Sequence, residues 1–497
     1  MRVDRTKIAL LFGPALLALS MRLYGLADKP LWLDEVITQK RANLPLLKSI
    51  ADSLHNVHFP AYFILVRAFD APIVDEWMLR LPSVMFGTIA VLLVAFIASE
   101  TYSPRAGLMA GTLMALSPVE VQFSQEARSY ALLSCLVLLA LWGLVCIAKY
   151  STAEVAEARP GAVRTGWIAY AVGTVGALNV LLVSAFWLLA SNFAMIVIVR
   201  RAANRTQLIR NWLVMQAVIL IVWLPGLAAI LLATHENSLR GYSWIPPSTR
   251  QHVWSVVSAV YLFRISDLTS FALFPEPVPG LGAAVVALAL FGAWWLRREP
   301  KLLAVIGFAF LIMPAGMLVM SIFHPVWVPR YLLWSTGPLF VLAGIGAAAL
   351  PRPGFVLVAT AIAIGGIVNL APYYSAETKP RWDLTAAYLA AHARPDDLIV
   401  ANNGFAKYVL GAYGDRYRLE EPILDGGNVA RAAARIAPPG RVWVVFGRVG
   451  QAMRVSESDY LKQWSALLGA PAATIRFGRN VVAFRFDPPH GAHDGAS

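Results

Sequence analysis

The sequence has little charge and almost no cysteine. Charged residues make up 14% of the 497 positions, hydrophobic residues make up 58%, and the mean hydropathy is +0.60. A soluble chain of this length could not bury so much apolar surface, so the composition predicts a polytopic membrane protein. Cys135 and Cys146 lie in one predicted span, about 16 Å apart along a helix, which excludes a disulfide between them.

Two further features are missing. No GxGxxG motif follows a predicted strand, which argues against a nucleotide-sugar donor. No internal repeat is visible, which argues against an inverted-repeat transporter. The net charge of +13 would suggest a nucleic-acid partner in a soluble protein. Here most of the excess lies in short loops between apolar runs, where it indicates topology, so we expect membrane lipid and no nucleic acid as a partner.

Apolar runs of suitable length predict about eleven transmembrane helices. They lie near 8–26, 80–100, 106–119, 131–148, two within 166–199, 212–232, 278–296, 302–322, 332–350 and 354–371. If the chain starts in the cytoplasm, the basic connectors all fall on that side, as Lys and Arg prefer. These connectors are Arg105, Lys149–Arg164, Arg200–Arg210, Arg297–Lys301 and Arg352.

The predicted organisation has three parts. Residues 1–372 form the transmembrane domain, with a large first outer loop at 27–79. In this loop the apolar run of "NVHFPAYFILVRAF" is too short to span and predicts a re-entrant or juxtamembrane helix. Residues 373–487 form a small α/β domain on the outer face. "RWDLTAAYLAAHA" and "DYLKQWSALLG" predict helices, "DDLIVAN" and "RVWVVFG" predict buried strands, and "ATIRFGRNVVAFRFD" predicts a hairpin. Residues 488–497 are expected to be disordered.

Several ionisable side chains are predicted at the outer ends of the spans. They are Asp34 and Glu35 in "KPLWLDEVITQ", His58, Arg80, Glu126 and Arg128 in "FSQEARSYALL", and Arg330 with Tyr331 in "HPVWVPRYLL". Each alone has a structural explanation, such as a helix cap, a snorkelling arginine or a self-neutralising ion pair. Together they place carboxylates and cations on one side of one membrane. Transfer from a phosphate-linked donor needs both, because a carboxylate takes the acceptor's proton while cations neutralise the departing phosphate.

These segments resemble the GT-C glycosyltransferases, specifically the protein O-mannosyltransferase-like group (family 39), which includes the aminoarabinose transferase of lipid A. The matching segments occur in the family's order and are "WLDEVIT", "HFPAYFILVRAF", "LRLPS", "SPRAGLMAGTLMALSP", "FSQEARSYALL", "PRYLL" and "RWDLTAAYLAAHARPDDLIV". The resemblance implies the GT-C fold and a polyprenyl-phosphate sugar donor. It also implies inverting transfer of a hexosyl or pentosyl group to a glycan, glycolipid or protein acceptor.

The resemblance also implies roles for single residues. Asp34 would be the general base or its close partner, and Glu35 would support it by orientation or by holding a metal. The remaining candidates would bind donor phosphate or sugar: His58, Arg80, Glu126, Arg128, Arg330 and Tyr331. His58 stands where the family motif keeps a histidine, but Phe59 replaces the first proline of His-Pro-Pro. No cofactor is required, although adjacent carboxylates would suit a hard cation such as Mg or Mn.

Two alternatives remain open from the sequence. A transporter or flippase of a lipid-linked saccharide would also have many spans, but it should hold its ionisable groups near the bilayer midplane. A structural assembly partner with a degenerate site would tolerate loss of the acidic pair. The high alanine and arginine content favours a bacterial inner membrane, with the site and the C-terminal domain facing the periplasm.

Overall fold

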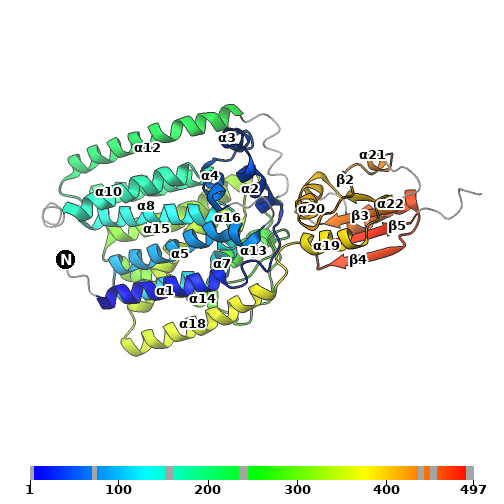
Figure 1. Ribbon diagram of the computed structural model, residues 1–497. Coiled ribbons are helices and arrows are strands. Elements are labelled where there is room, and N and C mark those ends of the chain that lie inside the picture. The colour runs from blue at the N-terminus through cyan, green and yellow to red at the C-terminus, as the bar shows by residue number, and fades with distance from the viewer. Residues whose placement is uncertain are drawn as a thin grey trace, which may run out of the picture.

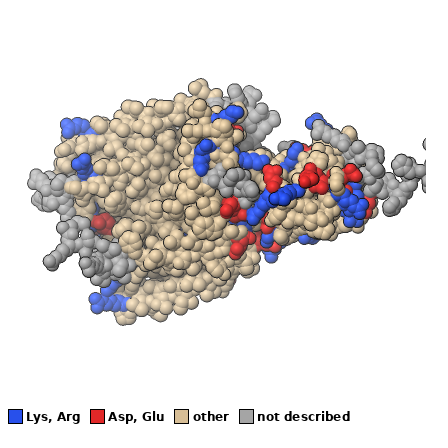
Figure 2. Space-filling model, in the orientation of Figure 1, with Lys and Arg blue, Asp and Glu red and all other residues tan. Residues whose placement is uncertain are grey.

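The computed structural model describes residues 5–69, 75–150, 160–233, 245–434, 441–447 and 456–487. Figure 1 shows a bundle of long, roughly parallel helices with a smaller α/β domain extending from one end, opposite the N-terminus. The visible flank of the bundle is almost free of charged side chains, as a lipid-facing surface requires (Figure 2). A few basic side chains lie at the end opposite the domain, while charged side chains of both signs are more frequent on and beside the domain (Figure 2). The predicted disordered tail, 488–497, lies outside the described residues.

A helix occupies each predicted apolar run. These helices are α1 (Arg5–Leu23), α5 (Glu76–Thr101), α6 (Pro104–Leu116), α8 (Tyr130–Tyr150), α10 (Pro160–Leu178), α11 (Ala185–Arg200), α12 (Arg205–Ala233), α14 (Leu281–Leu296), α15 (Pro300–Phe323), α17 (Thr336–Ala348) and α18 (Arg352–Ser375). Among the described residues, seven helical segments are long and apolar enough to cross a membrane, and two apolar segments are shorter. The chain is therefore a multi-pass membrane protein, but eleven full spans are not confirmed.

Helix α6 shows why the count falls short. The run 106–119 was predicted as one span, but α6 ends at Leu116, and a new helix, α7 (Pro118–Ser124), starts with Pro118 in its first turn. Proline has no N–H to continue the first helix and suits the first turn of the second. The 13 residues of α6 extend only about 20 Å, less than the hydrocarbon thickness of about 30 Å.

Glycines allow the central helices to pack closely. A Cβ at Gly292 of α14 would lie 1.9 Å from the Leu342 carbonyl oxygen of α17, and a Cβ at Gly346 would lie 2.0 Å from the Leu288 oxygen. No side chain fits at either position, so the two backbones meet directly. Small residues of this kind are a common means of joining membrane helices.

Short helices cover the end of the bundle that faces the C-terminal domain. They are α2 (Leu33–Asn43), α3 (Leu46–His55), α4 (Ala61–Val66), η1 (Arg67–Phe69), α7, η2 (Leu182–Ser184), α13 (Arg250–Tyr261), α16 (Pro329–Leu332) and η4 (Leu333–Ser335). Part of "NVHFPAYFILVRAF" is helical as predicted, and α4 and η1 together are too short to span a bilayer, which also agrees with the prediction.

The C-terminal domain contains a mixed sheet with strand order β2-β1-β3-β5-β4. Its elements are α19 (Trp382–His392), β1 (Leu398–Ala401), α20 (Gly404–Tyr417), β2 (Ile423–Asp425), α21 (Val429–Ala433), β3 (Val442–Gly447), α22 (Glu457–Leu468), β4 (Ala473–Phe477) and β5 (Val481–Phe486). Strands β2, β1 and β3 are parallel, and β5 is antiparallel to both β3 and β4. The predicted helices, buried strands and hairpin are present, whereas α20, β2 and α21 were not predicted.

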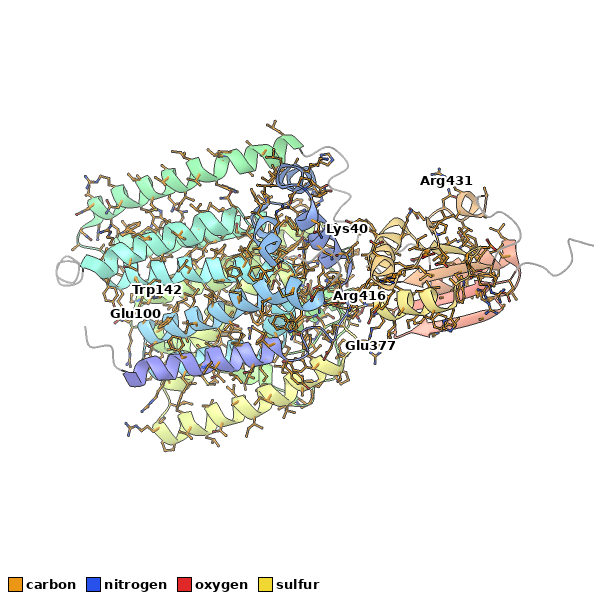
Figure 3. The ribbon with its side chains drawn as sticks, viewed as in Figure 1. Lys40, Glu100, Trp142, Glu377, Arg416 and Arg431 are labelled. Carbon is orange, nitrogen blue, oxygen red and sulfur yellow. The ribbon has the colours of Figure 1, made fainter. Side chains whose placement is uncertain are left out.

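Polar contacts hold the C-terminal domain against the bundle. The Tyr413 hydroxyl accepts a hydrogen bond from the Leu31 backbone N–H at 2.6 Å and donates to Glu76 Oε1 at 2.8 Å. Arg416 donates to both oxygens of Glu76. The Lys40 ammonium lies 3.8 Å from the centre of the Tyr408 ring. Figure 3 shows Lys40 and Arg416 at this junction. The domain therefore fixes the loop that leads into Asp34.

Candidate active site

The two acidic residues lie in the first turn of α2, which begins at Leu33. Glu35 Oε2 accepts a hydrogen bond from the backbone N–H of Trp32, the N-cap residue, at 3.3 Å. Carboxylates are favoured there because they satisfy free N–H groups and complement the positive end of the helix dipole. Neighbouring helical positions point in different directions, so Asp34 and Glu35 meet different partners.

Glu35 is completely buried and surrounded by donors. Its Oε1 accepts from Arg80 Nε at 2.8 Å and from the Ala127 backbone N–H at 3.0 Å, and its Oε2 accepts from Lys379 Nζ at 2.8 Å. Burial would raise the pKa of Glu35, but the charges of Arg80 and Lys379 outweigh it and lower that pKa to about 2. Lys379 was not predicted, because it lies 344 positions away in the linker to the C-terminal domain.

Arg80 has all five of its N–H donors engaged. Besides two bonds to Glu35, its guanidinium donates to three backbone carbonyls in the loop between α1 and α2, at 2.6–2.9 Å. These carbonyls belong to Leu26, Lys29 and Pro30. An arginine side chain has five donors in total, so none is left over for a phosphate oxygen in this arrangement. Arg80 instead fastens the loop between α1 and α2 to α5.

Asp34 is the partly exposed carboxylate of the site, with 21% of its side chain accessible. Its Oδ2 lies 2.7 Å from Arg330 Nη1 and 3.9 Å from Arg128 Nε. Burial acts to raise the pKa of Asp34, but Arg128 and Arg330 more than compensate and keep that pKa below the usual range. Asp34 is therefore an ionised, accessible carboxylate between two guanidinium groups at neutral pH.

The two arginines differ from Arg80 in how they are held. Arg128 makes long contacts, 3.5 Å to the Asp34 carbonyl, 3.4 Å to Thr38 Oγ1 and 3.4 Å to His58 Nε2. Bonds of this length are weak and readily exchanged for better ones. The guanidinium of Arg330 lies among aromatic rings, with centroids 5.5–5.9 Å away. These rings belong to Trp32, Tyr130 and Tyr331.

His58 is neutral, and its contacts define its tautomer. Burial, Arg128 and Arg41 lower the pKa of His58 to about 3. Arg128 can only donate, so Nε2 of His58 accepts, and Nδ1 carries the proton that it donates to the Asn56 carbonyl at 2.6 Å. The preceding residue, Val57, has φ 61°, a conformation that a β-branched residue rarely adopts. This turn directs the imidazole toward Arg128.

Glu126 is buried, and neither of its carboxylate oxygens has a hydrogen-bond partner among the described residues. It experiences the field of Lys379, Glu35 and Arg330. Burial is the largest effect and raises the pKa of Glu126 to about 7. Glu126 thus changes protonation near neutral pH, while the carboxyl groups of Asp34 and Glu35 stay ionised.

Glu126 should make stability depend on pH. Folding raises the pKa of Glu126 from 4.5 to about 7. The contribution of Glu126 to the free energy of unfolding is therefore present below pH 4.5 and is lost as the pH rises through about 7. We expect the thermal midpoint of Glu126→Gln to fall less than that of wild type between about pH 5 and pH 8. Thermal unfolding of both proteins in detergent measures the difference, and other titrating groups cancel because both proteins share them. Equal pH slopes would show that Glu126 titrates normally.

The structure brings the predicted residues to one end of the bundle, but into two units. One unit contains Asp34, Arg128, Arg330 and His58, and Tyr331 joins it through the Arg330 guanidinium. The other contains Glu35, Arg80 and the unpredicted Lys379. Glu126 interacts electrostatically with members of both units, with Arg330 in the first and with Glu35 and Lys379 in the second.

The site does not have the form of a metal centre. Asp34 and Glu35 are each paired with separate cations and do not share a common point. The described residues contain no group of three His, Cys, Asp or Glu side chains that could hold a metal ion. The described residues thus contain no preformed metal site, and the metal role of Asp34 and Glu35 stays a prediction.

Known structures share the arrangement of the whole chain. ArnT from Cupriavidus metallidurans, bound to undecaprenyl phosphate, matches with a TM-score of 0.59 and 13% sequence identity, over 97% of this chain and 98% of that one. The chain has the GT-C fold. The oligosaccharyltransferase of Archaeoglobus fulgidus matches with a TM-score of 0.56 and 11% identity, over 89% of this chain and 69% of that one.

No protein-family model matches the sequence, and no curated protein matches it. At 11–13% identity the structural likeness concerns the fold alone. The GT-C fold that the resemblance implied is confirmed, and the chemistry has to be argued from the site.

Proposed function

We propose that this GT-C protein is an inverting glycosyltransferase. It moves a sugar, a hexosyl or pentosyl group, from a polyprenyl-phosphate donor to an acceptor at the periplasmic face of a bacterial inner membrane. The observation that carries the proposal is the ionised, partly exposed carboxylate of Asp34, 2.7 Å from Arg330 and 3.9 Å from Arg128. A base and two phosphate-binding cations meet there at one end of the bundle.

The proposed reaction needs one accessible carboxylate. The acceptor O–H attacks the anomeric carbon, the bond from that carbon to the phosphate oxygen breaks, and its electron pair stays with the phosphate. The acceptor's proton passes to Asp34. A retaining enzyme would need a second carboxylate as nucleophile. Glu35 and Glu126 are completely buried, which favours the inverting route. The phosphate leaves as an anion, so a general acid is not required.

Donor binding would also activate the base. In the unliganded site the two guanidinium groups stabilise the carboxylate of Asp34 and lower its pKa, which makes it a weak base. An entering phosphate competes with Asp34 for Arg128 and Arg330, because bidentate guanidinium–phosphate pairs are among the strongest charged hydrogen bonds. Loss of these contacts would raise the pKa of Asp34. The base would then become effective only when the donor is in place.

The donor class is supported by the structural neighbours. One is the ArnT structure bound to undecaprenyl phosphate. Another, with a TM-score of 0.54, is the oligosaccharyltransferase AglB from Archaeoglobus fulgidus in complex with a dolichol-phosphate and an inhibitory peptide. In the A. fulgidus oligosaccharyltransferase structure with a TM-score of 0.56, the enzyme is tethered to an acceptor peptide. For this chain we propose a polyprenyl-phosphate sugar as donor and a glycan, glycolipid or protein as acceptor.

A transfer assay tests the proposal. The purified full-length protein in detergent is incubated with polyprenyl-phosphate sugars that carry a radiolabel, together with an envelope extract as acceptor source. We expect label to leave the lipid for one donor and to appear in an acceptor with inverted anomeric configuration. If the labelled lipids bind but none is consumed, the carrier alternative gains support. Flipping of the lipid in liposomes is then the next measurement.

Arg128 should contribute to donor affinity. Arg128→Gln removes a guanidinium whose hydrogen bonds to Asp34, Thr38 and His58 are long, at 3.4–3.5 Å. It also lies 3.9 Å from the Asp34 carboxylate and 5.8 Å from the centre of the Tyr130 ring. We expect undecaprenyl phosphate to bind roughly ten-fold more weakly, because hydrogen bonds to charged groups are worth about 1.5–3 kcal/mol. Isothermal titration in detergent measures the affinity. Arg41→Gln is the matched control, since Arg41 is paired with Asp52 at 2.6 Å. Unchanged affinity in Arg128→Gln would assign the phosphate to Arg330 alone.

A further inference from the structure

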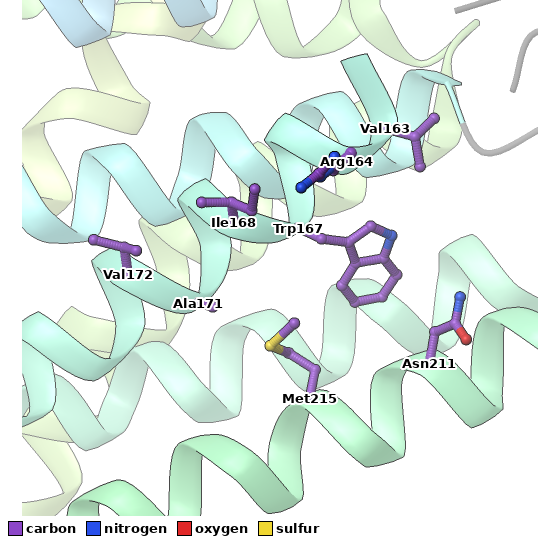
Figure 4. Close-up of a pocket in the computed structure, with 8 residues that line it drawn as sticks. All are labelled: Val163, Arg164, Trp167, Ile168, Ala171, Val172, Asn211 and Met215. Carbon is purple, nitrogen blue, oxygen red and sulfur yellow. The ribbon is translucent and has the colours of Figure 1, made fainter. Parts of the chain in front are cut away.

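A groove lies between α10 and α12, at the end of the bundle opposite the candidate active site. Its volume is about 720 Å³. Figure 4 shows the side chains of Trp167, from α10, and Met215, from α12, in the space between the two helices. The lining positions on α10 run from Val163 to Val172, a rise of about 14 Å. This is close to half of the hydrocarbon thickness of about 30 Å, so the groove has the length of one leaflet.

The groove exists because α10 packs closely on its other side. A Cβ at Gly143 of α8 would lie 2.5 Å from the Gly166 carbonyl oxygen of α10, so these backbones are in direct contact. A hydrogen bond and an aromatic contact join α12 to α10. Gln216 donates to the Tyr170 hydroxyl at 2.9 Å, and the Tyr170 ring lies 4.9 Å from that of Trp212. The back wall of the groove is therefore fixed.

Polarity changes along the groove. Arg164 and Asn211 line the end that lies near the basic connectors, and Trp167 comes next. Deeper in, the lining is apolar, with Ile168 and Val172 both about half exposed, at 52% and 54%. Arginine, tryptophan and aliphatic side chains thus follow one another along the groove. Membrane proteins show the same order from the lipid headgroups to the hydrocarbon core.

The charge at this end favours an anionic headgroup. Arg200 ends α11, Arg201 follows it, and Arg210 on α12 directly precedes Asn211 of the groove lining; all three side chains are exposed. Glu100 lies at the same end of the bundle (Figure 3), but it is paired with Lys149 at 2.8 Å. The positive potential at the mouth of the groove thus matches a phosphate group, while the apolar part matches an acyl chain.

We propose that this groove binds an anionic phospholipid of the leaflet at the basic end, with its phosphate at Arg164 and an acyl chain along Ile168 and Val172. The site is separate from the candidate active site, and the proposal does not depend on the transfer reaction. The lipid would fill the space between α10 and α12 and add to the contacts that Gln216 and Trp212 make from α12 to α10.

Native mass spectrometry of the purified full-length protein tests this site. Phosphatidylglycerol and phosphatidylcholine with the same acyl chains are titrated into delipidated protein in detergent. We expect wild type to prefer phosphatidylglycerol, and Arg164→Gln to lower that affinity at least about five-fold, the worth of one basic residue at an anionic surface. Arg352→Gln, which removes an exposed arginine outside the groove, should leave the affinity unchanged.

A second variant tests the acyl-chain part. Val172→Trp fills the apolar part of the groove and should weaken both lipids without removing charge. Equal binding of the two lipids by wild type, or unchanged phosphatidylglycerol affinity in Arg164→Gln, would overturn the proposal. Displacement of phosphatidylglycerol by undecaprenyl phosphate in wild type but not in Val172→Trp would also overturn it, since the groove would then hold the donor's tail.

Discussion

Asp34→Asn is expected to lower the transfer rate by about 10²–10⁴-fold, the usual contribution of a positioned general base. The substitution keeps the size of the side chain and its ability to accept a hydrogen bond from Arg330, but an amide cannot take the acceptor's proton. The fold should survive, because Asp34 is partly exposed and the buried ion pairs of α2 belong to Glu35. Initial rates with the donor found in the transfer assay give the measurement.

Donor affinity separates this explanation from general damage to the site. In Asp34→Asn the carboxylate no longer competes with the phosphate for Arg128 and Arg330, so undecaprenyl phosphate should bind as tightly as in wild type or more tightly. Asp52→Asn is the control, because Asp52, on α3, is also an aspartate in an arginine ion pair, 2.6 Å from Arg41. It should retain activity. Near-normal turnover in Asp34→Asn would assign the base to another group, and weaker donor binding would indicate a damaged site.

Much of the architecture could be predicted from the sequence because its signals are local. Apolar runs place the bundle helices, and the loss of those runs after Tyr373 indicates a separate domain. The break between α6 and α7 at Pro118 was missed, since the hydropathy continues through the proline. Strand β2 was missed because it has only three residues, too few for a periodic pattern.

The gathering of the candidate residues at one end of the bundle was predicted, apart from Lys379, but the pairing of their side chains was not. The motifs indicated that Asp34, Glu35 and the arginines would gather at one end, but not which arginine each carboxylate would meet. Lys379 reaches Glu35 only because α18 returns the chain to the end of the bundle where Glu35 lies, and no local sequence pattern indicates that contact. Arg80 anchors its loop through backbone carbonyls. Every residue has a carbonyl group, so the residue types in the sequence do not indicate these partners.

Arg80→Met is expected to destabilise the protein by about 3–5 kcal/mol, the cost of breaking a buried ion pair from one side. Arg80 and Glu35 are 1% and 0% exposed, so the substitution leaves a buried carboxylate with Lys379 as its remaining cationic partner. It also removes the donors to three carbonyls of the loop between α1 and α2. Thermal unfolding in detergent, followed by tryptophan fluorescence, measures the loss.

Lys149→Met is the matched control for this large effect. The Lys149–Glu100 pair has the same N···O distance, 2.8 Å, but its side chains are 37% and 33% exposed at the other end of the bundle. Its loss should cost less than about 1 kcal/mol, because water screens exposed pairs. Arg80→Lys should fall between the two, since an ammonium group keeps the charge but offers three donors in place of five. If Arg80 instead binds the donor phosphate, Arg80→Met will unfold like wild type and lose donor affinity. That result would return Arg80 to the group formed by Arg128 and Arg330.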